Sequence, residues 1–140
     1  LKKIIASGAA FAKFKEMAVL HGADVSALDD LSKLPKASIV KPFPAPAAGY
    51  LAQVDAESIG RAVLVLGGGR QKTDDQIDYG VGTSGLAKIG DQVAKGQPLV
   101  TVHANSPEKL AQAMAYIEKA FAIADKPVAA PKPIVDRITG

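Results

Sequence analysis

The sequence predicts an α+β fold preceded by a short helical segment, and three observations carry this prediction. Apolar residues recur at helical spacing over about 56–66 and 107–124. Short stretches of alternating apolar residues lie around these two segments and are typical of half-buried strands. Glycine and proline separate the two kinds of segment. We therefore expect helices packed on a mixed or antiparallel sheet.

The first strand and helix are predicted at 50–54 and 56–66. Asp55 stands between them, where a carboxylate accepts a hydrogen bond from the first turn of a helix. Apolar side chains of the helix then form one stripe, made of Ile59, Ala62, Val63, Val65 and Leu66. Gly67, Gly68 and Gly69 are expected to end the helix, because glycine takes the left-handed conformation without a Cβ clash.

Two further strands are predicted where the residues alternate, at Ile77–Val81 and Leu99–His103. Gly90-Asp91 and Lys95-Gly96 are expected to form turns between them, with Val93 and Leu99 pointing inward.

The second long helix is predicted to begin at Ser106-Pro107-Glu108, which offers an N-cap hydroxyl, a proline at the first position and an early carboxylate. Its apolar stripe indicates a helix reaching about Ala124, through Leu110, Met114, Ile117 and Phe121. A last strand is predicted at Ile134–Ile138.

The first 35 residues are predicted to be helical. A break is expected at Ser7-Gly8, and a further turn over Ser26–Leu31 should stop before Pro35. One helical face is expected to join a core, and it carries Phe11, Phe14, Met17 and Ala18. The next passage contains Pro42, Pro44 and Pro46, so a strand at Ile39-Val40 must either lie at a sheet edge or end at these prolines. We place the domain boundary near Lys36, giving segments 1–35 and 36–140.

Composition excludes several classes of protein. The chain has 140 residues, of which 48% are apolar, so it can form one core. Its 17 basic and 14 acidic residues are scattered, which argues against nucleic-acid binding. Cysteine is absent, so disulfides and cysteine-based zinc sites are excluded. No apolar run is long enough for a membrane span. We expect a cytoplasmic protein and, because the chain begins with Leu1, a piece of a longer one.

The loop at Gly67–Arg70 has two interpretations. Glycine amides and an arginine can bind phosphate, but here the glycines follow a helix instead of opening one. We therefore favour a structural turn in which Arg70 pairs with one of three aspartates, Asp74, Asp75 or Asp78. The same aspartates could bind a divalent cation, although turn formation is the commoner role. His21 and His103 have no fixed partner in the sequence, and we expect ordinary surface or packed residues.

Two motifs carry a family resemblance, GGGRQKTDDQIDYGVG at 67–82 and GDQVAKGQPL at 90–99. They closely resemble the C-terminal domain of thymidine phosphorylase and pyrimidine-nucleoside phosphorylase. The similarity extends upstream to 7–17 and 29–35, and so covers nearly the whole chain.

The resemblance implies a homodimeric parent enzyme that converts a pyrimidine nucleoside and phosphate into free base and pentose 1-phosphate. It also implies that residues 1–35 form the edge of a preceding α/β domain. The family's phosphate-binding and pyrimidine-binding motifs do not occur here, so we assign no catalytic residue, cofactor or metal. The expected role of this piece is structural, helping a rigid body close over the substrates.

The stretch 90–99 also resembles the hairpin of biotinyl and lipoyl carrier domains, which makes a carrier module the alternative function. The expected fold is thus an α/β-hammerhead with a barrel-like hairpin, related to that sandwich. A carrier lysine lies exposed at a tight turn between two strands, usually flanked by Met or Asp. The candidates are Lys88 and Lys95, and neither is expected to have that context.

Overall fold

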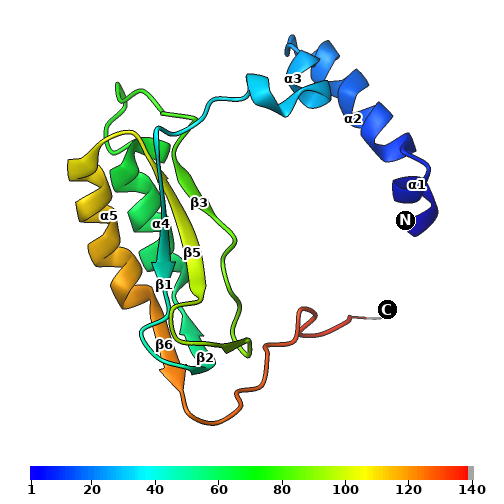
Figure 1. The fold of residues 1–140 in the computed structure, drawn as a ribbon. Coiled ribbons are helices and arrows are strands. Elements are labelled where there is room, and N and C mark those ends of the chain that lie inside the picture. Colours follow the sequence, from blue (N-terminus) through cyan, green and yellow to red (C-terminus); the bar gives the residue numbers. More distant parts are fainter. Residues whose placement is uncertain (139–140) are drawn as a thin grey trace. The chain divides into compact units, whose positions relative to one another are not determined.

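The computed structural model describes residues 1–138 and divides the chain into two compact units, Leu1–Pro35 and Lys36–Gly140 (Figure 1). The first unit is helical. It contains α1 (Lys2–Ala6), α2 (Ala9–Leu20), α3 (Ser26–Asp29) and the short 3-10 turn η1 (Leu31–Lys33). The predicted break between the first two helices is confirmed, because Gly8 between them takes a left-handed φ of 75°.

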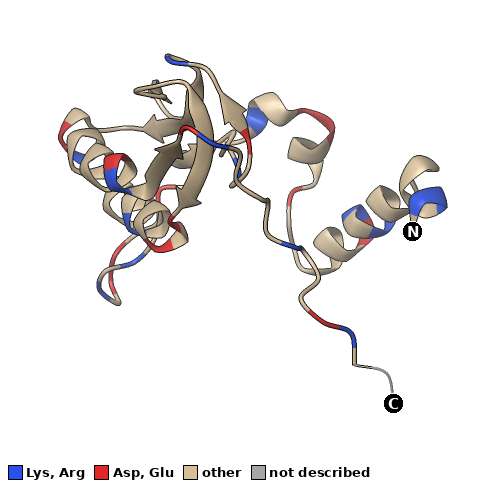
Figure 2. Cartoon of the chain, turned by 90° about the horizontal axis from the view of Figure 1, so that it is seen from below, with Lys and Arg blue, Asp and Glu red and all other residues tan. Residues whose placement is uncertain are grey.

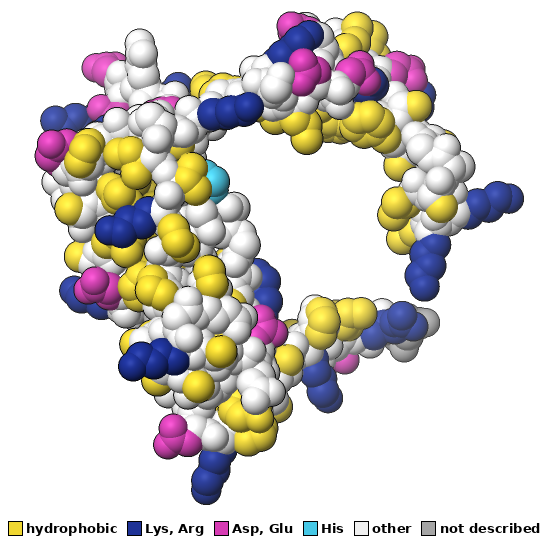
Figure 3. Space-filling model, viewed as in Figure 1, with side chains coloured by type: hydrophobic (Ala, Val, Ile, Leu, Met, Phe, Trp, Pro, Cys, Tyr) yellow, Lys and Arg dark blue, Asp and Glu magenta, His cyan; other side chains and the backbone are white. Residues whose placement is uncertain are grey.

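The apolar face of α2 is exposed, which corrects the prediction that it joins a core. Phe11, Phe14 and Met17 are 49%, 46% and 49% exposed, and no residue of α1, α2, α3 or η1 is buried. Figure 3 shows apolar side chains gathered along these helices. The physical reason is size, since a 35-residue unit of short helices has no second layer on which to pack this face.

The second unit confirms the α+β prediction and contains two helices and two small antiparallel sheets (Figure 1). The helices are α4 (Ala56–Val63), extended by a π-helical turn η2 (Leu64–Gly68), and α5 (Pro107–Ala120). Sheet A has the strand order β1-β5-β3 and sheet B the order β4-β2-β6. Their bounds are β1 (Ile39–Pro44), β2 (Gly49–Val54), β3 (Gly82–Ser84), β4 (Gln92–Val93), β5 (Pro98–Ala104) and β6 (Phe121–Ala124).

Strand β1 lies at an edge of sheet A, as its prolines predict. It pairs only with β5 among the described strands, with Ile39 opposite Ala104 and Phe43 opposite Val100. Because Pro42 has no N–H, it cannot donate to a further strand on the open side.

Both predicted helix starts are confirmed by their caps. Asp55 Oδ2 accepts a hydrogen bond from the Ser58 amide at 3.0 Å, and Ser106 Oγ accepts one from the Lys109 amide at 3.2 Å. The predicted end of the second helix at Ala124 is wrong. The helix stops at Ala120, whose carbonyl accepts a hydrogen bond from the Asp55 amide at 2.8 Å, and Phe121–Ala124 pairs with β2 as strand β6.

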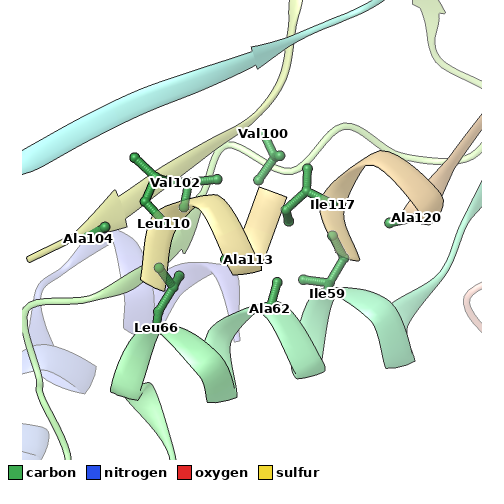
Figure 4. Close-up of a cluster of buried hydrophobic side chains, with 10 residues drawn as sticks. All are labelled: Ile59, Ala62, Leu66, Val100, Val102, Ala104, Leu110, Ala113, Ile117 and Ala120. Carbon is green, nitrogen blue, oxygen red and sulfur yellow. The ribbon is translucent and has the colours of Figure 1, made fainter. Parts of the chain in front are cut away.

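The main core lies between the two helices and the inner face of sheet A (Figure 4). Helix α5 contributes the largest share of the buried side chains, and α4, η2 and β5 supply the others. They are Ile59, Ala62, Leu66, Val100, Val102, Ala104, Leu110, Ala113, Ile117 and Ala120.

A second, smaller cluster forms where sheet B meets the start of β5. Its members are Ala45, Leu51, Val93 and Leu99, so the predicted inward positions of Val93 and Leu99 are confirmed. The stacked rings of Phe43 and Phe121, with centroids 5.9 Å apart, pack against both clusters.

Two predicted strands are absent from the described residues. Ile77–Val81 forms a turn and irregular backbone, because the Asp78 amide donates to the Gly67 carbonyl at 2.9 Å instead of to a neighbouring strand. Ile134–Ile138 has no strand partner and its apolar side chains are exposed. None of the helices within residues 1–138 has the length and apolar character needed to cross a membrane.

Candidate functional site

The glycine loop that follows α4 is shaped by two close constraints. Gly67 has a φ of 105°, so it reverses the chain in a conformation that other residues rarely adopt. A Cβ on Gly68 would lie 2.7 Å from Val63 Cγ1 and 3.2 Å from the Val63 carbonyl oxygen. Glycine is therefore required here for backbone conformation at the first position and for close packing at the second.

Asp78 closes this loop through a chain of side-chain hydrogen bonds. Its Oδ2 accepts from Asn105 Nδ2 at 2.8 Å, and its Oδ1 accepts from the Gly80 amide at 2.9 Å. Asn105 Oδ1 in turn accepts from the Ser38 amide at 2.7 Å. The network of Ser38, Asn105 and Asp78 thus joins segments 67 positions apart in the sequence.

The environment of Asp78 favours its charged form. The hydrogen bond from Asn105 is the largest cause that lowers the pKa of this carboxyl, followed by the Gly80 amide, and the charge of Lys109 adds to them against the opposing effect of burial. Lys109 lies close to the loop, since its Nζ would be 3.2 Å from a Cβ on Gly67.

The predicted pairing of Arg70 with an aspartate is not formed. Within residues 1–138 Arg70 makes no ion pair, and its side chain lies in the exposed part of the loop. Asp75 instead accepts hydrogen bonds from the amides of Gln71 and Lys72 at 3.0 and 2.9 Å. Short acidic side chains at turns commonly bond to nearby amides in this way, and the arginine is not needed to hold the turn.

The three aspartates do not converge on a metal site. Asp75 and Asp78 face different amides, and Asp74 is exposed. In the described part of the chain, no group of three histidine or acidic side chains is placed to hold a metal ion.

A shallow hollow of about 350 Å³ lies beside the loop. Lys72 and Lys109 bring two ammonium groups to it, and Asp75 brings one carboxylate. Three loop amides are already used by the protein: those of Gln71 and Lys72 donate to Asp75, and that of Asp78 donates to the Gly67 carbonyl. These three amides are therefore not available to an anion in the hollow.

The two histidines lie in different units. His21 caps the C-terminal end of α2 and is exposed. His103 lies on β5, where its Nε2 is 2.7 Å from Ser84 Oγ on the adjacent strand β3. A serine and a histidine at this distance share a hydrogen bond, but the side chain that would orient such a histidine for catalysis is not among its hydrogen-bonding partners in residues 1–138.

Lys95 lies at an exposed turn between β4 and β5, with Ala94 and Gly96 as its neighbours in the chain. Those two strands belong to different sheets, so the turn does not close a paired hairpin. Lys88 precedes the turn at Gly90, and its amide donates to Asp91 Oδ2 at 2.8 Å.

Three residues that complete the loop could not be found from the sequence. They are Ser38, Asn105 and Lys109, which lie far from the glycines in the chain and outside the glycine-rich motif at 67–82. Their positions before β1, after β5 and in the first turn of α5 bring them together only in the folded unit.

The fold and the loop together define a small α+β module built around a glycine-rich helix end. A sequence model of the pyrimidine nucleoside phosphorylase C-terminal domain matches residues 50–124. The chain therefore belongs to the pyrimidine nucleoside phosphorylase C-terminal domain family.

Curated relatives match three quarters or more of the chain. It is 39% identical over 132 residues to a thymidine phosphorylase of Burkholderia orbicola, covering 94% of this chain and 30% of the relative. It is 43% identical over 105 residues to a pyrimidine-nucleoside phosphorylase of Bacillus subtilis, covering 75% of this chain and 24% of that relative. It is 35% identical over 139 residues to a pyrimidine-nucleoside phosphorylase of Geobacillus stearothermophilus, covering 99% of this chain and 32% of that relative. The chain thus spans about a third or less of the length of these relatives.

Proposed function

We propose that this chain is the C-terminal part of a thymidine or pyrimidine-nucleoside phosphorylase. The parent enzyme converts thymidine and phosphate into thymine and 2-deoxyribose 1-phosphate. The carrying observation is the match of nearly the whole chain to enzymes of that name, together with the family match over 50–124. In this proposal the nucleoside and the phosphate bind to parts of the enzyme outside the matched stretch.

The role of the present chain is structural and serves domain closure. The loop residues Gly67, Gly68, Gly69, Arg70, Asp75 and Asp78 shape and hold one end of the module and do not bind substrate. Support comes from the loop amides, which donate to Asp75 and to the Gly67 carbonyl. A rigid module lets a hinge motion elsewhere in the enzyme align phosphate with the sugar and exclude water.

The proposal also covers the domain organisation, the localisation and the oligomeric state of the parent enzyme, as the family resemblance implies them. Residues 1–35 form the edge of the preceding α/β domain, and their exposed apolar face supports this placement. Residues from Lys36 onward form the C-terminal domain, with an α/β-hammerhead fold related to the biotinyl and lipoyl sandwich. The parent is a cytoplasmic homodimer that pairs through its helical domain.

The experiment is an assay of thymine release from thymidine and phosphate, performed on two proteins. The first is this chain alone, which we expect to be inactive. The second is a chimera in which the matched 105 residues of this chain replace the corresponding stretch of the Bacillus subtilis enzyme, which we expect to be active. Activity of the chain alone, or an inactive but folded chimera, would contradict the proposal.

Carrier function is the second candidate, because Lys95 is exposed at a turn. Intact-mass analysis after co-expression with a biotinyl or lipoyl ligase tests it. We expect no added mass, with Lys95→Arg as the matched control, and an added group that disappears in this variant would establish the carrier function instead.

A further inference from the structure

The outer face of sheet A is formed by two rows of residues that cross its three strands. In the first row Val40 lies opposite His103, which lies opposite Gly82. In the second row Pro42 lies opposite Thr101, which lies opposite Ser84. We call these six residues the uncharged face, and they are Val40, Pro42, Gly82, Ser84, Thr101 and His103.

The opposite face of the same sheet is fully occupied by the core. Val100, Val102 and Ala104 alternate with Thr101 and His103 along β5 and are completely buried under α4 and α5. On the uncharged face, by contrast, Val40 is 58% exposed, and Pro42 and Ser84 are exposed as well.

Charge is nearly absent from the strands. Among the residues of β1 to β6 only Lys41 is charged, and it lies in register with buried Val102, on the other side of the sheet from Val40 and Pro42. Figure 2 shows the charged residues concentrated on the helices and loops. An antiparallel sheet with one solvated face normally carries polar and charged side chains on it, whereas interface cores are depleted of charge.

Two of the three polar side chains of the uncharged face hydrogen-bond to each other. Ser84 Oγ and His103 Nε2 lie 2.7 Å apart. A polar pair that keeps its hydrogen bond is covered at little cost, while an unpaired polar group loses its bonds to water.

We propose that the uncharged face is the surface on which the remainder of the phosphorylase chain docks. This inference rests on the proposed function. The occupant is the part that the relatives carry outside the matched stretch, which amounts to about 70% of the Burkholderia enzyme because the match covers 30% of it. Its contact surface is correspondingly uncharged, and it places its own donors and acceptors away from Val40 and Gly82, which carry no polar side chain.

The test introduces one carboxylate at a time into the chimera with the Bacillus subtilis enzyme and into this chain alone. Val40→Glu and Ser84→Glu place the charge on the two outer strands of the uncharged face. Gln112→Glu places the same charge on the exposed side of α5 and is the matched control. Thermal unfolding and nucleoside phosphorolysis are measured for each protein.

In the chain alone, we expect all three variants to melt within about 4 °C of the unsubstituted protein, as exposed substitutions do. In the chimera, Val40→Glu and Ser84→Glu should split the single unfolding transition into two and lower phosphorolysis at least about tenfold, because they bury an unpaired charge at the interface. Gln112→Glu should leave the unfolding of the chimera as a single transition and phosphorolysis within about twofold of the unsubstituted chimera. If Val40→Glu unfolds the chain alone, Ser84→Glu decides the outcome.

If Val40→Glu and Ser84→Glu affect the unfolding and the activity of the chimera no more than Gln112→Glu does, the docking proposal is overturned. If this chain alone forms a dimer and Val40→Glu abolishes that dimer, the docking proposal is overturned and a second copy of the chain is the occupant. An inactive chimera whose single transition is still split by the face variants would contradict the proposed function but support the docking surface.

Discussion

Removing the side chain of Ile117 should destabilise the second unit strongly. Ile117 is 0% exposed and lies between α4 and β5 in the main core, near Ile59 and Val100 (Figure 4). Ile117→Ala removes a methylene and two methyl groups, and at about 0.8 kcal/mol for each buried carbon the lost transfer energy is about 2.4 kcal/mol. Because helices and sheet enclose this position, the cavity persists, and the total should reach about 3–5 kcal/mol.

The measurement is urea unfolding of the 140-residue chain followed by far-ultraviolet circular dichroism. The control is Arg70→Ala, which removes an exposed side chain without an ion pair and should change the free energy of unfolding by less than about 0.5 kcal/mol. Should Ile117→Ala leave no folded protein, Ile117→Val should still cost about 0.5–1.5 kcal/mol. A cost below about 1 kcal/mol for Ile117→Ala, or an equal cost for Arg70→Ala, would refute the assignment of the stabilising energy to the core.

Three further predictions concern the loop and α4. In a double-mutant cycle on stability, the effects of Asp78→Ala and Asn105→Ala should be non-additive, whereas those of Asp78→Ala and Arg70→Ala should be additive. Because folding lowers the pKa of Asp78 below its ordinary value of 3.8, its contribution is complete above that value and is lost as pH falls through the lowered folded pKa. Acid titration of stability should thus show the difference between the unsubstituted protein and Asp78→Asn disappearing at low pH, and a constant difference would contradict this. Gly68→Ala should destabilise the unit through its clash with Val63, while Gly60→Ala, in open space within α4, should stabilise it by about 0.5–1 kcal/mol in thermal or urea unfolding.

Features decided by neighbouring residues could be predicted from the sequence. The caps at Asp55 and Ser106 depend on a side chain and an amide three positions later, so local pattern is sufficient. The left-handed turn at Gly67 is equally local. The edge position of β1 is one of the two outcomes that its prolines allow.

Features decided by distant partners could not be predicted in this way. Phe121 continues the apolar stripe of α5, but pairing with β2 is available at that point and the helix gives way to a strand. Residues 77–81 alternate like a strand, yet the Gly67 carbonyl takes the Asp78 amide. The predicted pairing of Arg70 with an aspartate is wrong for the same reason. Asp78 instead bonds to Asn105, which lies 27 positions away, although Arg70 lies only eight positions away.

The Asp78 network also determines how the uncharged face is held. Ser38 immediately precedes β1, Asn105 immediately follows β5, and Asp78 precedes β3. Because β5 runs antiparallel to both neighbours, these three residues meet at the same end of sheet A. Their hydrogen bonds therefore fix the strands against one another at that end, and with them the register that aligns Val40 and Gly82 with His103. The loop thus acts on the docking surface by holding its strands in place, which requires no substrate contact from Arg70.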